Sequence, residues 1–246
     1  MSPLNKVALF TLIALSHLHA DMIGGEASLG FFNHEPSGSA SYKSSDASLE
    51  DTFGFTEEQD MVLKAYLEHP FPFLPNIKLG YTTLSHEGSS SVDNFSWGDI
   101  GTIDGHIDSS ISLDMTDVTL YFEVLDNWVE VDAGLTLRNF SGEMSVVTAG
   151  GESDSADFSM WAPLLYGKAR FNIPVTDLSF QLEANAISYW DITAYDYELS
   201  ARYTLMMGIG LEAGYRSIHI DSDNLVNGFH AYADFSGPYA AAIWDF

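Results

Sequence analysis

The final residues, Gly237–Phe246, constrain the fold of this chain more than any other stretch. If they form a β-strand, residues of equal parity point to the same side of the sheet. One side then carries only the apolar residues Ala240, Ala242, Trp244 and Phe246. The chain ends of soluble domains are usually polar and frayed, so a wholly apolar face here indicates contact with lipid. We expect this stretch to be the closing strand of a membrane barrel.

Period-two alternation of apolar and polar residues recurs along the chain in segments about ten residues long. These segments are Met22–Asn33, Met61–His69, Asn76–Glu87, Ile111–Leu125, Trp128–Phe140, Met160–Ile173, Leu178–Trp190, Ala194–Leu205 and Ile209–Ile220. With the closing strand they make ten, and an even number returns the chain to the side on which it started. The sequence predicts an all-β fold, a transmembrane antiparallel up-and-down β-barrel of about ten strands, with eight as the alternative.

The links between these segments alternate between long and short. Long, polar, acidic stretches follow the first, third, fifth and ninth segments, at 34–58, 88–108, 141–159 and 221–236. The other links are short, and the one between His69 and Pro75 is rich in proline, which a hydrogen-bonded ladder excludes. Short periplasmic turns with long extracellular loops are typical of outer-membrane barrels. A soluble β-sandwich explains the alternation but not this asymmetry.

The first twenty residues have the pattern of a secretory signal peptide. Lys6 supplies a positive charge, an apolar run follows at Val7–Leu15, and Ala20 offers a small residue for cleavage. The apolar run is too short to cross a bilayer as a helix. We therefore expect residues 1–20 to be removed and residues 21–246 to form a single outer-membrane barrel domain. The sequence has no cysteine, so disulfides contribute nothing to its stability.

The charge balance narrows the range of partners. The chain has 9 Lys+Arg against 35 Asp+Glu, a formal net charge of −26. Such a chain repels phosphate backbones, so nucleic acid is not expected as a partner. With 13% aromatic and 46% hydrophobic residues it is also too apolar for an acidic disordered chain. The expected partners are outer-membrane lipid, lipopolysaccharide and the barrel assembly machinery, while the oligomeric state is left open.

Charged residues inside the predicted strands share one face, opposite the apolar face. A charge on the lipid side costs about 2–4 kcal/mol at the bilayer midplane, so the charged face is expected to line the lumen. The candidate lumen residues are Lys64, Lys78, Glu123, Glu130, Asp132, Arg138, Lys168, Arg170, Glu183, Glu198, Arg202, Glu212 and Arg216.

Two interpretations of this interior remain open. Acid–base pairs can fill a narrow lumen and plug it, which would leave a structural barrel or a surface-interaction barrel used for adhesion. Alternatively, mixed charge can line a narrow porin-like channel for small solutes or ions. In a channel, the residues expected to set ion preference are Arg138, Lys168, Arg170, Arg202 and Arg216.

Most of the remaining acids lie in the predicted outer loops. They are Asp46, Glu50, Asp51, Glu57, Glu58, Asp60, Asp93, Asp99, Asp104, Glu152, Asp154, Asp157, Asp221 and Asp223. We interpret them as a solvated rim, with weak Ca²⁺ or Mg²⁺ binding as the sharper alternative, although no EF-hand spacing is present. No other cofactor and no dedicated metal site is expected.

Rings near the predicted strand ends are expected to anchor the barrel at headgroup depth. They are Trp128, Trp161, Trp190, Trp244, Phe71, Phe73, Tyr195 and Tyr239.

An enzymatic function is the least favoured class. The chain has no Gly-x-Ser-x-Gly elbow and no His-Glu-x-x-His helix. Ser217 and His219 are neighbours on one predicted face, as are Ser85 and His86 in sequence, but both are weak candidates for a nucleophile and base. We expect no catalytic residues, with a barrel lipase or protease as the residual alternative.

Several short motifs resemble one group of bacterial outer-membrane proteins, named for a Gly-Gly pair near the mature amino terminus. They are Gly24-Gly25, Leu74-Pro75-Asn76-Ile77, Leu125-Asp126-Asn127-Trp128-Val129 and Asp132-Ala133-Gly134-Leu135, with Phe246 at the end. The resemblance implies a barrel in the outer membrane of a Gram-negative bacterium. It also implies that Trp244 and Phe246 form the signal read by the assembly machinery, and it implies no settled activity.

Overall fold

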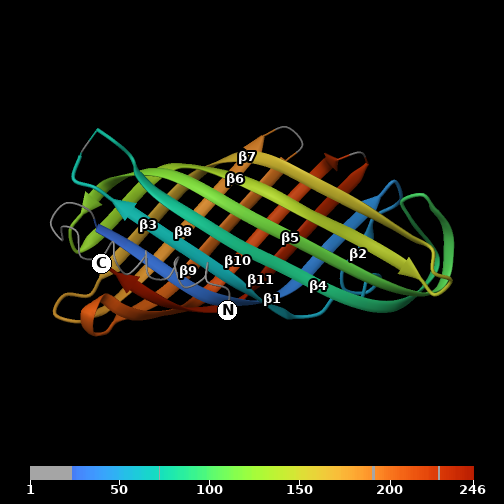
Figure 1. Cartoon of the computed structure of the whole chain (residues 1–246), viewed down its shortest axis with the longest axis horizontal. Helices are drawn as coiled ribbons and strands as arrows, with labels where there is room; N and C mark the ends of the chain where they lie inside the picture. The colour runs from blue at the N-terminus through green and yellow to red at the C-terminus, as the bar shows by residue number, and fades with distance from the viewer. Residues whose placement is uncertain (1–23, 72, 190–191, 227) are drawn as a thin grey trace, which may run out of the picture.

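The computed structural model describes residues 24–71, 73–189, 192–226 and 228–246. Its strands wrap into a long barrel in which they run oblique to the long axis (Figure 1). The wall strands are β1 (Gly24–Tyr42), β3 (Glu58–Glu68), β4 (Asn76–Trp97), β5 (Ile100–Asp126), β6 (Val129–Thr148), β7 (Ser153–Asn172), β8 (Leu178–Tyr189), β9 (Ile192–Thr204), β10 (Ile209–Val226) and β11 (Phe229–Asp245). The expected signal peptide, Met22 and Trp190 lie outside the described residues.

The barrel is closed and antiparallel throughout. Each wall strand pairs with the next in the chain, and β11 returns to pair with β1. Backbone hydrogen bonds join Gly25 and Phe246 in both directions, with N···O distances of 2.9 and 2.8 Å. A two-residue strand, β2 (Ala47–Ser48), pairs only with β1. The prediction of ten strands is thus confirmed for the wall, with β2 as an extra piece.

One part of the outer surface is apolar, and it surrounds the half of the barrel that holds Gly24 and Phe246. We call this end proximal and the opposite end distal. Exposed outward side chains of this belt include Leu29, Phe31, Leu63, Leu79, Leu120, Phe122, Leu135, Leu137, Leu165, Leu182, Leu199 and Leu211. On β6 the outward apolar run Val129–Leu137 has the length that a tilted strand needs to cross a hydrocarbon core. The described residues include no helix able to span a bilayer.

The predicted long outer loops are wrong. Residues expected to be loops continue the strands instead: β4 and β5 extend to a tight connection at Gly98, and β6 and β7 meet across 149–152. β10 and β11 likewise run on through most of 221–236. Only 43–57 remains a long connection, and it contains β2. The acidic residues assigned to loops therefore lie mostly on strands or at their tips.

These extensions were missed because the alternation changes phase. On proximal β5 the apolar residues, such as Leu120 and Phe122, point outward. Beyond Asp117 on the same strand, Met115 and Leu113 point inward and are buried, while Ser112 and Asp108 are not. The same inversion occurs on β6, where Met144 is buried. Distal strands thus enclose an apolar core and turn a polar face to water, as in a soluble barrel.

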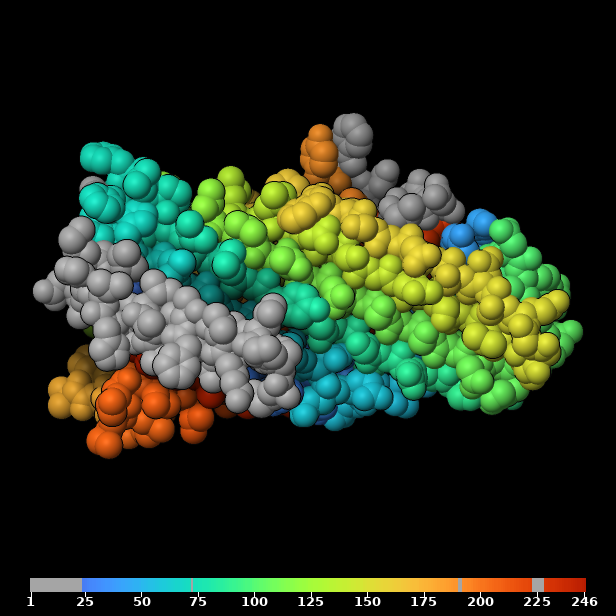
Figure 2. All heavy atoms as spheres, in the orientation of Figure 1, coloured from blue at the N-terminus to red at the C-terminus, as the bar shows by residue number. Residues whose placement is uncertain are grey.

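Two places in the distal wall lack a continuous ladder. The β3–β4 pairing ends at Val62–Thr82, and the segment 43–57 packs into the gap, where Phe55 forms a bridge with Gly88. The β7–β8 pairing ends at Leu165–Ala186, although β7 begins at Ser153. In Figure 2 the orange end of β8 stands out from the surface beside the yellow β7.

Candidate functional site: the barrel interior

The proximal lumen is crossed by ion pairs from opposite walls. Arg202 contacts Glu26 at 2.6 Å and Glu212 at 3.2 Å. Arg170 also reaches Glu26, at 3.2 Å, and contacts Glu130 at 3.4 Å. Because β1, β6, β7, β9 and β10 all contribute, these pairs bridge the barrel instead of following one strand.

A second layer lies on the distal side of the first and combines lysines, acids and tyrosines. Lys64 contacts Glu198 at 2.6 Å, and Lys78 forms an ion pair with Glu183. Glu183 also accepts a hydrogen bond from Tyr66 at 2.6 Å. Lys168, 2.6 Å from Asp132, lies 5.0 Å from the Tyr66 ring centroid. Desolvated ammonium groups are thereby paired with carboxylates and ring faces, which offsets part of the cost of burying them.

Two arginines form the distal boundary of the charged interior. Arg138 donates two hydrogen bonds of 2.7 Å to Asp117 and one of 2.8 Å to Asp196. Arg216 contacts Asp196 through two nitrogens, at 3.0 and 2.8 Å. Such forked contacts fix both guanidinium planes. We call these three layers the charged plug; the residual cavity between Lys64 and Arg216 is about 10 Å³.

The candidate lumen residues are distributed as follows. Inside the barrel and buried lie Lys78, Asp132, Arg138, Lys168, Glu183, Glu198, Arg202, Glu212 and Arg216, with Lys64, Glu130 and Arg170 half-buried. Glu123 is exposed at the proximal mouth, where it accepts a hydrogen bond of 2.9 Å from Asn76. Their role in ion preference stays a prediction.

Sequence reasoning missed several members of the plug. Glu26, Asp117, Asp196, Tyr66, Tyr121 and Tyr166 were not among the candidates, although strand parity alone places them inward. The expectation for Tyr239 is wrong: this ring does not anchor the barrel in lipid but is buried, and its hydroxyl donates to Glu198 at 2.8 Å. Tyr239 has the same parity as Asp245 and not as Trp244, and this parity could have predicted that its ring points into the barrel.

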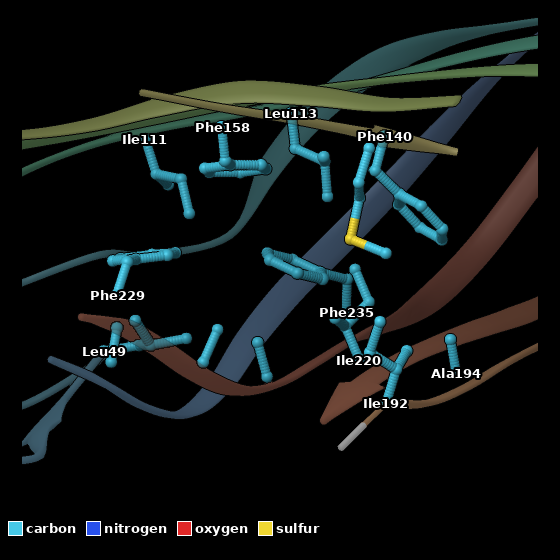
Figure 3. Close-up of a pocket in the computed structure, with 14 residues that line it drawn as sticks. Leu49, Ile111, Leu113, Phe140, Phe158, Ile192, Ala194, Ile220, Phe229 and Phe235 are labelled. Atoms are coloured by element: carbon cyan, nitrogen blue, oxygen red, sulfur yellow. The ribbon is translucent and has the colours of Figure 1, made fainter. Parts of the chain in front are cut away.

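On the distal side of the plug the interior is largely apolar, apart from a few buried polar side chains such as His34 and His86. Figure 3 shows a small cavity there, which we call the distal chamber, with a volume of about 30 Å³. Its lining consists of Ala40, Leu49, Ile111, Leu113, Phe140, Phe158, Met160, Ile192, Ala194, Ile220, Phe229, Ala231, Ala233 and Phe235. The boundary with the plug is formed by ring–cation contacts, since Arg216 lies over Phe32 at 5.6 Å and Arg138 over Phe140 at 5.7 Å.

The distal end of the chamber is closed by aromatic side chains. Phe158 and Phe229 stack with ring centroids 5.4 Å apart. Trp97 packs edge-on against Phe53, which segment 43–57 inserts into the core, and its indole donates to the Asp154 carbonyl at 3.2 Å. Trp97 and Phe53 are fully buried. Among the described residues, these side chains fill the distal end of the barrel.

Two buried histidines lie beside segment 43–57, distal to the apolar belt. The rings of His34 and His86 are 4.7 Å apart. His34 Nε2 is 3.2 Å from an Asp60 carboxylate oxygen, and His86 Nδ1 is 2.8 Å from the Thr56 carbonyl. Burial lowers the pKa of His34 to about 4 and also lowers the pKa of His86. Both rings are thus held neutral in the folded barrel.

Of the weak nucleophile candidates, Ser217 and His219 lie apart from the distal chamber and the plug, whereas the His86 ring stacks on Phe235 of the chamber lining, with ring centroids 5.6 Å apart. His219 is stacked on Tyr195, packs against Tyr232, and lies 2.8 Å from Asp234. Ser217 is on the same strand face. His86 is inside the barrel, whereas the exposed pair Ser89 and His106 contact each other at 3.0 Å on the distal surface. Among the described residues, no group of three or more potential ligands is arranged to hold a metal ion.

Comparison with known proteins gives only distant structural similarity. No family model and no curated protein matches the sequence, so the Gly-Gly family is not confirmed. The attachment invasion locus protein Ail of Yersinia pestis, solved with the heparin analogue sucrose octasulfate, is 10% identical; the match covers 91% of this chain and 99% of Ail, with a TM-score of 0.41. A major outer membrane protein of Thermus thermophilus is 12% identical; the match covers 93% of this chain and 100% of that protein, also with a TM-score of 0.41. At these scores we transfer none of their functions.

Proposed function

We propose that this chain is an outer-membrane β-barrel of a Gram-negative bacterium with a closed lumen, and that it acts through its distal end as a structural or surface-interaction barrel. The observation that carries the proposal is the filled interior. Within the charged plug, the cavity between Lys64 and Arg216 has a volume of about 10 Å³, and aromatic rings close the chamber on its distal side. For a solute to pass through the lumen, both the charged plug and the aromatic rings would have to rearrange.

The placement in the membrane rests on the two-sided chemistry of the wall. An apolar belt faces outward only around the plug, where the interior is charged. Transmembrane barrels alternate in this way, apolar toward lipid and polar toward the lumen. Beyond the belt the pattern reverses, which matches a part that stands in water. The partners we propose for the belt are outer-membrane lipid and lipopolysaccharide, with assembly by the barrel assembly machinery.

The distal outer surface is the part of the barrel that would contact a partner, and its side chains are polar and acidic. Ser112, Glu143, Asp157 and Ser159 point outward on neighbouring strands β5, β6 and β7. Long paired strands hold this polar, acidic face rigidly, because backbone hydrogen bonds run to within a few residues of the tips. A partner that binds it would need a polar or basic surface.

A narrow channel is the second candidate, favoured by the seven basic side chains that meet acids inside one lumen. The deciding measurement is the conductance of purified, refolded protein in planar bilayers under a salt gradient, beside a conducting porin as control. We expect no discrete steps from samples that show the heat-dependent gel shift of a folded barrel. Reproducible steps would overturn the closed-lumen proposal. In that case Arg216→Glu should move the reversal potential, and an unmoved potential would remove Arg216 from selectivity.

A further inference from the structure

A cluster of aromatic side chains lies on the outer face of β9, β10 and β11, which are neighbours in the sheet (Figure 1). Tyr195, His219 and Tyr232 have the parity of the outward belt residues on their own strands, and Asp234 shares the parity of Tyr232. The register places His219 opposite Tyr195 on one side and opposite Asp234 on the other. We call these four residues the tyrosine platform. None of the four lines the distal chamber or the cavity in the plug.

His219 holds the two tyrosine rings of the platform in fixed positions. It is only 6% exposed although it lies on the outer face, because its ring is stacked on Tyr195 with centroids 4.6 Å apart and contacts Tyr232 edge-on at 5.2 Å. Its Nδ1 lies 2.8 Å from a carboxylate oxygen of Asp234, which fixes the orientation of the imidazole. Tyr195 and Tyr232 remain 39% and 51% exposed. The platform therefore offers ordered ring surface to a ligand at little entropic cost.

The platform also has free polar groups beside its rings. Within the described part of the chain, no hydrogen-bond partner is found for Nε2 of His219 or for the hydroxyls of Tyr195 and Tyr232. When Nδ1–H of the neutral ring donates to Asp234, Nε2 is left as an acceptor, whereas the tyrosine hydroxyls can donate and accept. A ligand with several hydroxyl groups can therefore pair with all three side chains.

Anchoring in the headgroup region does not account for the whole platform. On β11 the apolar outward residues end at Pro238, and Ser236 and Asp234 follow before Tyr232. Six residues of strand span roughly 20 Å, which is about 14 Å along the axis of a barrel whose strands tilt by about 45°. The headgroup region of a bilayer is only about 5–8 Å deep on each side. Tyr232 therefore lies beyond phospholipid headgroups, at a height that the larger sugar heads of outer-leaflet glycolipids reach.

The charges around the platform disfavour charged ligands. Glu35 and Asp221 point outward beside it. Of the basic residues in the described ranges, only Lys43, near the distal tip, lies outside the plug. A phosphate or sulfate group would thus meet carboxylates and no Lys or Arg. A cation would find no aromatic cage, because His219 packs against both tyrosine rings and occupies the space between them.

We propose that the tyrosine platform binds a neutral hexose in the head of an outer-leaflet glycolipid. The C–H face of such a sugar can stack on the exposed rings, whose faces are the negative side of the ring quadrupole. Its hydroxyls can donate to Nε2 of His219. One such contact is weak, but the membrane keeps the sugar at the platform at a high effective concentration. The inference rests on the proposed membrane placement and names a partner for the surface-interaction function, but it does not depend on whether the lumen conducts.

Hydroxyl-radical footprinting of the folded protein in lipid nanodiscs tests the proposal. The nanodiscs would contain phospholipid with either lipid A or a lipopolysaccharide whose core ends in neutral hexoses, so that the two samples share a lipid anchor and differ in the core sugars. We expect the core sugars to lower the oxidation of Tyr195 and Tyr232 about threefold, because stacking covers their exposed faces. Tyr203, which lies in the belt on β9, should be oxidised equally in both samples. Equal oxidation of Tyr232 in the two samples would overturn the proposal.

A ring deletion separates stacking from general shielding by the sugar layer. Tyr232→Ala removes one ring, so Tyr195 should lose its protection by the core sugars, whereas Tyr232→Phe keeps the ring and should keep the protection. Tyr203→Ala, on the same strand as Tyr195 but inside the belt, is the matched control and should leave the protection unchanged. The gel shift checks that each variant folds, and Tyr195→Ala with Tyr232 as the readout replaces a variant that does not. Protection of Tyr195 that persists in Tyr232→Ala would contradict the proposal, because the sugars would then cover the platform without stacking on it.

A soluble probe identifies the source of the sugar. Lipid-free, dephosphorylated core oligosaccharide would be mixed with the folded protein in detergent micelles and examined by saturation-transfer NMR. We expect transfer to the C–H protons of the hexose, several-fold weaker in Tyr232→Ala than in wild type. Transfer to the oligosaccharide without protection in nanodiscs would indicate a soluble glycan and overturn the glycolipid assignment. Conductance steps from a barrel whose platform is still protected would remove the closed-lumen function and leave this inference standing.

Discussion

Each buried charge of the plug is paired with at least one group of opposite charge. Arg138 is 2% exposed and holds both Asp117 and Asp196. Replacing a whole buried ion pair by apolar groups is often tolerated, but removing one partner leaves an uncompensated charge and costs about 3–5 kcal/mol. For the same reason, no single residue of the plug can be assigned a separate role. Asp196 pairs with two arginines, and Glu183 pairs with two lysines and accepts a hydrogen bond from a tyrosine.

The histidine pair makes the distal end sensitive to acid. The charged and titratable groups that face His34 are His86, Asp60 and Arg216. Because the pKa of His34 falls from 6.5 unfolded to about 4 folded, the unfolded chain binds the extra proton first. Stability is therefore full above pH 6.5 and declines as the pH falls toward 4, by at most about 3 kcal/mol for this group. The effect should be seen as faster proteolysis within 43–57, the segment that His86 bonds through Thr56.

A matched variant separates this effect from general acid sensitivity. His106 is 53% exposed on the distal surface, so His106→Ala should leave the pH dependence of cleavage unchanged. His34→Gln removes the titrating ring and should flatten the dependence between pH 6.5 and about 4. If His34→Gln and wild type are cleaved with the same pH profile, His34 is not the responsible group.

At the scale of elements, the sequence correctly predicted the proximal parts of the strands, which carry the apolar belt, and missed their distal extensions. The proximal parts of β3, β6 and β9 were placed within a few residues, because a bilayer enforces apolar-out alternation. The distal parts of β4 and β5 have the opposite phase and carry many Ser and Asp residues, which also occur in loops. The inward alternation of Ile107, Ser109, Leu113 and Met115 was visible, yet its meaning depended on where the bilayer ended.

The partners within the plug were beyond sequence reasoning for a different reason. Parity gives the face of a residue but not its height or its neighbour across the lumen. Lys64 and Glu198 are 134 residues apart and meet at 2.6 Å only because the barrel closes with a particular register. Tyr239 shows the same limit, since its ring was assigned by its position near a strand end when its parity pointed inward.

The glycine pair next to the closure has a steric explanation that yields a prediction. A Cβ on Gly25 would lie 2.7 Å from the Phe246 ring and 2.8 Å from the Tyr66 carbonyl oxygen, whereas one on Gly24 meets only Glu68, at 3.9 Å. We expect Gly25→Ala to lower the free energy of unfolding by about 1–3 kcal/mol, and Gly24→Ala to change it little. Urea-induced loss of the gel shift measures both. Equal midpoints for the two variants would show that Gly25 does not limit packing at the β1–β11 closure.

For the whole molecule, the decisive feature is the level along the barrel at which the outward face changes from apolar to polar. This level sets how far the barrel extends out of the membrane. Leu120 and Ser112 point outward from the same strand, β5, on either side of the inversion. Leu120→Arg places a charge in the apolar belt and should cost about 2–4 kcal/mol near the midplane. Ser112→Arg adds the same side chain in water beside Glu143, its partner in the β5–β6 register, and should cost almost nothing.

Unfolding in lipid vesicles, followed by the gel shift in urea, compares the two variants with wild type. A large loss for Leu120→Arg with none for Ser112→Arg would place the bilayer boundary between these two residues. Equal losses would mean that lipid covers Ser112 as well. The polar distal surface would then be buried in lipid, and the proposed surface-interaction function would fail.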